Sequence, residues 1–217
     1  MENKREVIRL RTDYSNWEPL PVQEVNSIFS GISIDWGIAG GWALDIHLGR
    51  KTRNHSDTDI VVFREDQHVV YQHLKNDWTL FKAKDGKLSL WSADEYLDSI
   101  NSVWVSRDSQ SPWAFEIMFM DSEQDNWIYR REKTVQEARV ELFSTDENNV
   151  PYLNPAIQLL YKGGAVLYKG GAAQIREKDS QDFLAVLPTL SVKEKIWLKE
   201  SLKRQFSMGH SWIPHLE

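Results

Sequence analysis

Hydrophobic and polar positions along the chain repeat with the periods of both helices and strands. Apolar residues at helical spacing from Val22 to Phe29 predict an amphipathic helix over residues 21–30. The turn residues Asp85-Gly86 between two apolar runs predict a β-hairpin. The same criteria predict strands over 32–39, 58–63, 78–82, 88–91, 102–106 and 113–120, and helices over 42–48 and 65–74. The positions of the last helix expected to face inward are Val69, Val70, His73 and Leu74.

The pattern becomes helical in the last third of the chain. Asn154-Pro155 is typical of a helix start, with Asn as the N-cap and Pro at the first helical position. The helices predicted here span 156–162, 181–187 and 191–205. Strands followed by helices indicate an α+β fold with a mixed sheet. We place an N-terminal domain over residues 1–150 and a C-terminal helical domain over 151–217.

Composition excludes several classes of protein. The chain has 217 residues, of which 41% are hydrophobic and 27% charged, as in a globular protein that buries its own core. The absence of cysteine excludes a disulfide scaffold, a thiol nucleophile and cysteine-based metal sites. No apolar run approaches the roughly 20 residues that span a bilayer, and no secretory signal is visible, so a cytoplasmic protein without a membrane partner is expected. The net charge of -6 disfavours a nucleic-acid partner.

Asp57 and Asp59 form the first candidate for chemistry. In an extended segment, residues i and i+2 point to the same face, about 6.5–7 Å apart. Two carboxylates so placed can converge on Mg²⁺, which takes oxygen ligands and keeps room for water and phosphate. The apolar run that follows puts the pair at the mouth of a buried strand. The alternative interpretation is a solvated turn, because Asp-x-Asp is a common sequence.

Gly40 and Gly41 precede this pair, between a predicted strand and a predicted helix. Such a corner presents free backbone N–H groups to an anion, so a phosphate bound there could be bridged by a metal to Asp57 and Asp59. A simple tight turn is the alternative interpretation. The pattern GxxxxGK[ST] of a P-loop is absent from the chain.

A third carboxylate would complete the metal site or accept a proton from an attacking hydroxyl. Glu116 lies inside an apolar strand, where a carboxylate is costly unless it is paired or bound to metal. It could instead lie on the exposed face of an edge strand. Asp121, at the strand end, is the second choice.

Several other polar residues invite supporting roles. We expect His55 to give hydrogen-bonding support and Asp45 to hold the motif loop. Arg130-Arg131 is interpreted as a solvated corner, and Lys178-Asp179 with Asp182 as a charge cluster on a helix surface. The repeated segment Tyr-Lys-Gly-Gly-Ala, at 161–165 and 168–172, is interpreted as a local duplication in a loop.

Three motifs follow one another between residues 40 and 59. They are Gly40-Gly41-Trp42-Ala43-Leu44-Asp45, Leu48-Gly49-Arg50 and Arg53-x-His55-x-Asp57-x-Asp59. Together they resemble the signature of the nucleotidyltransferase superfamily, and within it the aminoglycoside 2''-adenylyltransferase and lincosamide nucleotidyltransferase group. The match is dense over residues 37–63 and looser elsewhere, although it covers most of the chain.

The resemblance implies an enzyme that uses Mg²⁺ and ATP or another nucleoside triphosphate. It would transfer a nucleoside monophosphate to a hydroxyl of a small acceptor such as an aminoglycoside or lincosamide, and so act in antibiotic resistance. The resemblance assigns the metal to Asp57, Asp59 and Glu116, a position where many relatives carry Asp. It assigns nucleotide contacts to Gly40 and Gly41, and neutralisation of phosphate charge to Arg53.

Some alternatives stay open at this point. The chain could be a protein-modifying nucleotidyltransferase of toxin–antitoxin type, or a nucleotide-binding module without turnover. The acceptor, the preferred triphosphate and the oligomeric state are not given by the sequence. A C-terminal lysine that contacts phosphate could be Lys162, Lys169 or Lys178.

Overall fold

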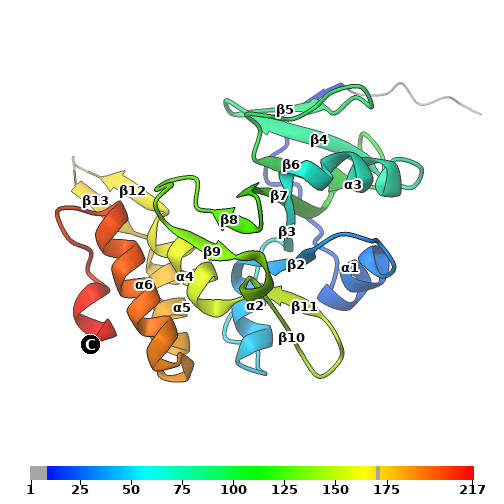
Figure 1. Cartoon of the computed structure of the whole chain (residues 1–217). Helices are drawn as coiled ribbons and strands as arrows, with labels where there is room; N and C mark the ends of the chain where they lie inside the picture. The colour runs from blue at the N-terminus through cyan, green and yellow to red at the C-terminus, as the bar shows by residue number, and fades with distance from the viewer. Residues whose placement is uncertain (1–8, 170–171) are drawn as a thin grey trace, which may run out of the picture. The chain divides into compact units, whose positions relative to one another are not determined.

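The computed structural model describes residues 9–169 and 172–217 (Figure 1). The chain forms two compact units, and each unit is discontinuous in sequence. One comprises residues 1–36 and 56–120, and the other comprises residues 37–55 and 121–217. The boundary expected at residue 150 describes a different division of the chain and stays a prediction. In the part of the chain that the structure describes, no helix has the length and apolar character needed to cross a membrane.

A six-stranded arrangement forms the sheet of the first unit. Its order is β1 (Leu10–Arg11), β5 (Lys87–Leu90), β4 (Thr79–Lys84), β6 (Ser102–Ser106), β7 (Trp113–Glu123, up to Met120 in this unit) and β3 (Asp59–Phe63). Neighbours are antiparallel except for β7 and β3, which are parallel. The β4–β5 hairpin is confirmed: Asp85 and Gly86 have φ values of 50° and 70°, as its tight turn requires.

The described part of this unit contains two α-helices. Helix α1 (Val22–Phe29) buries Val22, Val25 and Phe29, which confirms the amphipathic helix. A short 3₁₀ turn, Arg64–Asp66, leads into α3 (Gln67–Leu74). Val70 and Leu74 are buried there as expected.

The inward positions predicted for α3 are wrong at two residues. Val69 is 45% exposed, and His73 is also exposed, with its Nε2 2.6 Å from the carbonyl oxygen of Ile28. The helix has eight residues, and its buried stripe contains Gln67, Val70 and Leu74 at spacings of three and four. Neighbours of those positions therefore face solvent.

Short strands hold together the second unit. Parallel to β2 (Trp36–Ala39) lies β11 (Pro151–Leu153), which pairs in turn with antiparallel β10 (Phe143–Thr145). The end of β7 pairs with β8 (Asn126–Ile128), and β8 pairs with β9 (Gln136–Ala138), which precedes a 3₁₀ turn at Arg139–Glu141. Sequence patterns missed β8 to β11 because three residues are too few to display an alternation. Both units confirm a mixed sheet in an α+β fold.

Four α-helices lie among the described residues of the second unit. They are α2 (Gly40–His47), α4 (Pro155–Gly163), α5 (Glu177–Val186) and α6 (Val192–Gln205), followed by 3₁₀ turns at Leu187–Thr189, after α5, and Ile213–Leu216. Helix α4 contacts both α5 and α6 (Figure 1). Its start is as predicted: Pro155 is in the first turn, and the Asn154 side chain accepts the N–H of Ala156 at 2.9 Å.

Most described residues of the repeated segment lie in a helix or strands, so the loop interpretation is wrong for those residues. Its first copy ends α4. Its second copy contributes to an antiparallel hairpin formed by β12 (Val166–Lys169) and β13 (Ala172–Ile175). Gly170 and Gly171 lie outside the described residues.

Tryptophan serves mainly in packing. Six of the ten tryptophans in the chain are buried: Trp36, Trp78, Trp91, Trp113, Trp127 and Trp212. In the first unit the Trp113 ring packs on Phe81 and Leu88. In the second, Trp212 stacks on Phe183 with ring centroids 4.3 Å apart.

Candidate active site

The first unit brings together Asp57, Asp59 and Glu116. Asp59 is the first residue of β3, and the parallel register pairs it with Glu116 in the middle of β7. The Glu116 N–H donates to the carbonyl of Thr58 at 2.9 Å, which fixes this register. Asp57 lies two residues before Asp59 and acts electrostatically on Glu116. The three carboxylates therefore gather where β3 begins.

Buried Thr58 holds this strand end from the other side. Its hydroxyl donates to the carbonyl of Leu20 at 2.8 Å, and Leu20 N–H donates to the carbonyl of Ala114 at 2.9 Å. The four residues after Asp59 are all buried, so the rigid part of β3 begins directly behind the acidic pair. Groups held in this way on a packed sheet keep a precise geometry.

Glu116 has an unusual proton affinity. Burial and the negative charge of Asp57 together raise its pKa from the ordinary 4.5 to about 7, although the Ser102 and Trp104 hydrogen bonds act in the opposite direction. The Ser102 hydroxyl donates to Glu116 Oε1 at 2.6 Å. A carboxyl poised near neutral pH can accept and release a proton during catalysis.

The donor set suits a hard divalent cation. Among the residues that the structure describes, no group of three His, Cys, Asp or Glu side chains has an arrangement that could hold a metal ion. Mg²⁺ does not require such a cage, because it commonly takes one or two carboxylates and completes its shell with water and substrate phosphate. Two aspartates of one strand end beside a glutamate, all with oxygen donors, fit that mode of binding.

Metal-free protein offers a direct check on this cluster. We expect the Glu116 carboxyl to titrate near pH 7 in a ¹³C NMR experiment, and Asp57→Asn to lower the midpoint by removing a neighbouring charge. Because the folded pKa is raised, the neutral carboxyl stabilises the fold below the unfolded value, and this stabilisation is lost as the pH rises through about 7. A midpoint at the ordinary value in both proteins would contradict the assignment.

In the second unit, Asp45 organises the motif loop. The Asp45 side chain, only 4% exposed, accepts the Thr52 N–H at 3.0 Å and the Thr52 hydroxyl at 2.5 Å through Oδ1. Its Oδ2 pairs with Nε2 of the buried His55 ring at 2.5 Å. Burial lowers the pKa of His55, although Asp45 opposes the shift. The supporting roles expected for Asp45 and His55 are confirmed.

The two glycines are required by their surroundings. Gly40 begins α2 with a φ of +67°, and its N–H donates to Gln158 Oε1 at 2.8 Å. At Gly41 an added Cβ would lie 2.3 Å from His55 Nδ1 and 2.6 Å from Arg53 Nη2. The absence of a side chain at Gly41 therefore lets the loop fold back against it. Their contact with nucleotide stays a prediction.

Arg53 belongs to a largely buried ion-pair network. Its Nε donates to Asp182 Oδ1 and its Nη2 donates to Asp182 Oδ2, both at 2.9 Å. Lys162 Nζ is 2.7 Å from Asp182 and 3.2 Å from Asp179, and Arg176 Nε is 2.5 Å from Asp179. Both aspartates are buried, at 0% and 4% exposure. The interpretation of Asp179 and Asp182 as part of a surface cluster is wrong, because α5 turns this face toward α4.

The network also separates the candidate lysines. Lys162 is buried between two carboxylates, whereas Lys178 is exposed. The side chain of Lys169 lies outside the described residues. Asp121, the second choice for the third acid, pairs with Arg130 through two contacts of 2.7 and 2.9 Å. Arg130 is thus half-buried in an ion pair, which corrects the solvated corner for this residue, whereas Arg131 is exposed as expected.

Solved structures show the class of the fold. The lincomycin-bound lincosamide antibiotic adenylyltransferase LnuA matches at 15% identity and a TM-score of 0.50, over 79% of this chain and 97% of that one. ANT(2'')-Ia in complex with adenylyl-2''-tobramycin matches at 13% identity and a TM-score of 0.54, over 84% of this chain and 97% of that one. An antigenic nucleotidyltransferase-like protein from Paracoccidioides brasiliensis matches at 16% identity and a TM-score of 0.50, over 90% of this chain and 89% of that one. The fold is that of a nucleotidyltransferase.

The sequence itself identifies the family. The family described as aminoglycoside-2''-adenylyltransferase matches residues 21–184, about three quarters of the chain. The chain belongs to this family and is a nucleotidyltransferase. A search of the curated proteins found no match.

Proposed function

We propose that this enzyme transfers AMP from ATP, with Mg²⁺, to a hydroxyl of an aminoglycoside or lincosamide. The observation that carries the proposal is the gathering of Asp57, Asp59 and Glu116 at the start of β3, with the pKa of Glu116 raised to about 7. Membership of the family supports the reaction class. The neighbours crystallised with lincomycin and adenylyl-2''-tobramycin support the class of acceptor.

Each carboxylate has a separate task in this proposal. Asp57 and Asp59 would hold Mg²⁺, which when bound neutralises phosphate charge and favours departure of pyrophosphate. Glu116 accepts the proton of the acceptor hydroxyl on a carboxylate oxygen. The acceptor oxygen then forms a bond to the α-phosphorus as the bond to pyrophosphate breaks. Ser102, which donates to Oε1, fixes the orientation of the Glu116 carboxyl.

The motif residues of the second unit have proposed nucleotide roles. Gly40 and Gly41 present backbone N–H groups at the start of α2, a position suited to phosphate oxygens. Because the Gly40 N–H donates to Gln158, phosphate would take the place of that side-chain acceptor. Arg53 is held in a fixed orientation by Asp182, and its guanidinium can offset phosphate charge. The family motif supports these three assignments.

The net charge supports a cationic acceptor. At pH 7 the chain carries a formal net charge of -6. This charge attracts polycations such as aminoglycosides over a distance that depends on the ionic strength. Lincosamides lack such a high charge, so the acceptor panel decides between the two classes.

Pyrophosphate release with an acceptor panel tests the proposal. Purified protein with ATP and Mg²⁺ is incubated with tobramycin, lincomycin or buffer. Pyrophosphate release is measured, and the products are identified by mass spectrometry. We expect one adenylyl group on one acceptor class, and no release when EDTA is added. GTP replaces ATP in a parallel series. Adenylylated protein instead of drug would favour the protein-modifying alternative, and no transfer by folded protein would overturn the proposal.

A further inference from the structure

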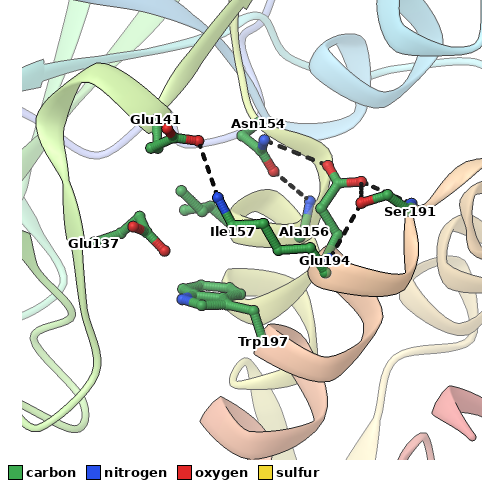
Figure 2. Close-up of a pocket in the computed structure, with 9 residues that line it drawn as sticks. Glu137, Glu141, Asn154, Ala156, Ile157, Ser191, Glu194 and Trp197 are labelled. Carbon is green, nitrogen blue, oxygen red and sulfur yellow. Dashed lines mark hydrogen bonds and ion pairs between the residues drawn. The ribbon is translucent and has the colours of Figure 1, made fainter.

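A separate pocket of about 190 Å³ lies wholly within the second unit (Figure 2). It is formed by β9, the 3₁₀ turn after it, and the first turns of α4 and α6. Figure 2 shows Glu137 and Glu141 on one side and the Trp197 ring on another, facing a common space. Its lining shares no residue with the carboxylate cluster of the first unit.

The two helix starts at this pocket do not make it an anion site. At α4, the side chain of Asn154 accepts the Ala156 N–H at 2.9 Å. At α6, Ser191 Oγ accepts the Glu194 N–H at 3.2 Å, and Glu194 in return accepts the Ser191 N–H at 2.8 Å. Side chains of the protein thus cap donors that an anion would otherwise bind.

The charge of the lining favours a cation. Three glutamates, Glu137, Glu141 and Glu194, and one lysine, Lys193, give a formal charge of −3 + 1 = −2. Lys193 lies 3.6 Å from Glu141, but the two side chains are 77% and 53% exposed. An exposed pair of this kind is weak, so a ligand cation can displace the lysine.

Apolar surface lies beside the charges. Trp197 is half-buried and Ile157 is buried, and both line the pocket. An aromatic ring next to carboxylates suits an organic ammonium, which contacts the ring face and the negative charge together. The volume is below the about 300–1,000 Å³ of pockets for drug-sized ligands, so it takes one small ring or chain.

We propose that this pocket binds a small organic amine, with the ammonium group between Glu137 and Glu141 and the carbon framework against Trp197 and Ile157. It stands independently of the proposed adenylyl transfer, because no residue is common to the two sites.

Binding of matched probes tests the proposal without nucleotide or metal. Cyclohexylamine, protonated at neutral pH, is titrated against the neutral cyclohexanol. The readout is the indole N–H resonance of Trp197, assigned by its loss in Trp197→Phe. We expect saturable shifts with the amine and at least a tenfold weaker response with the alcohol. Equal responses, or no shift with either probe, would overturn the proposal.

Substitutions in the pocket lining should change the affinity for the amine in opposite directions. Glu137→Gln and Glu141→Gln should each weaken amine binding about threefold, the loss expected for one solvent-accessible ion pair. Lys193→Ala should strengthen binding, because it removes the competing cation. Glu147→Gln, at an exposed position outside the lining, is the matched control and should change nothing. The site assignment fails if Glu147→Gln equals Glu137→Gln, or if Mg²⁺ alone binds and displaces the amine.

Discussion

Asp57→Asn is expected to lower the rate of nucleotidyl transfer about a thousandfold, because a bound metal ion contributes several kcal/mol to the transition state. The neutral amide keeps the size of the side chain but loses the charge that holds Mg²⁺. Asp57 precedes β3 and is only half-buried, so its replacement leaves the packed strand unchanged. The expected loss is in kcat rather than in the fold.

The rate loss must be separated from misfolding. Asp94→Asn, an exposed residue of the same unit, makes the same chemical change and should retain full activity. Circular dichroism and the melting temperature should match wild type for both variants. Raised Mg²⁺ should recover part of the Asp57→Asn activity, since the defect lies in metal affinity. If Asp57→Asn turns over at the wild-type rate, Asp57 is not a ligand in the reaction.

Local patterns predicted most elements of the fold. The Asp85-Gly86 hairpin and the Asn154-Pro155 helix start were predictable because each depends on neighbours in sequence. Strands of three residues, such as β10 and β11, left no such signal. They form because partners distant in the chain complete their hydrogen bonds, which no short window contains.

The candidate site divides in the same way. The spacing of Asp57 and Asp59 and the glycine corner were visible in one segment. The pairing of Glu116 with Asp59 could not be seen in one segment, because the two residues lie 57 positions apart in the chain (116 − 59). The Arg53–Asp182 ion pair joins residues separated by 129 positions. Its only local signal was two acids three apart before buried Phe183, a pattern also typical of an exposed helix face.

Asp182→Ala is expected to destabilise the protein by about 3 kcal/mol, because in a largely buried network it leaves Arg53 without its carboxylate and Lys162 with only one of its two. Asp182 contacts Arg53 through both oxygens and Lys162 at 2.7 Å, while only 4% exposed. Urea denaturation measures the free energy of unfolding. Glu177→Gln, an exposed position of the same helix, should change it by less than about 0.5 kcal/mol.

The origin of this loss can be tested by pH and by a second substitution. Burial alone would raise the pKa of Asp182, but the Arg53 hydrogen bonds and the Lys162 charge hold it below its usual value. The stabilisation is therefore complete above the unfolded pKa of about 3.9, and it is lost as the pH falls through the lower folded pKa. Arg53→Met should recover part of the stability of Asp182→Ala, since it removes the cation whose carboxylate partner was Asp182. A difference between wild type and Asp182→Ala that persists unchanged into strong acid would mean that packing, and not charge, holds α5 in place.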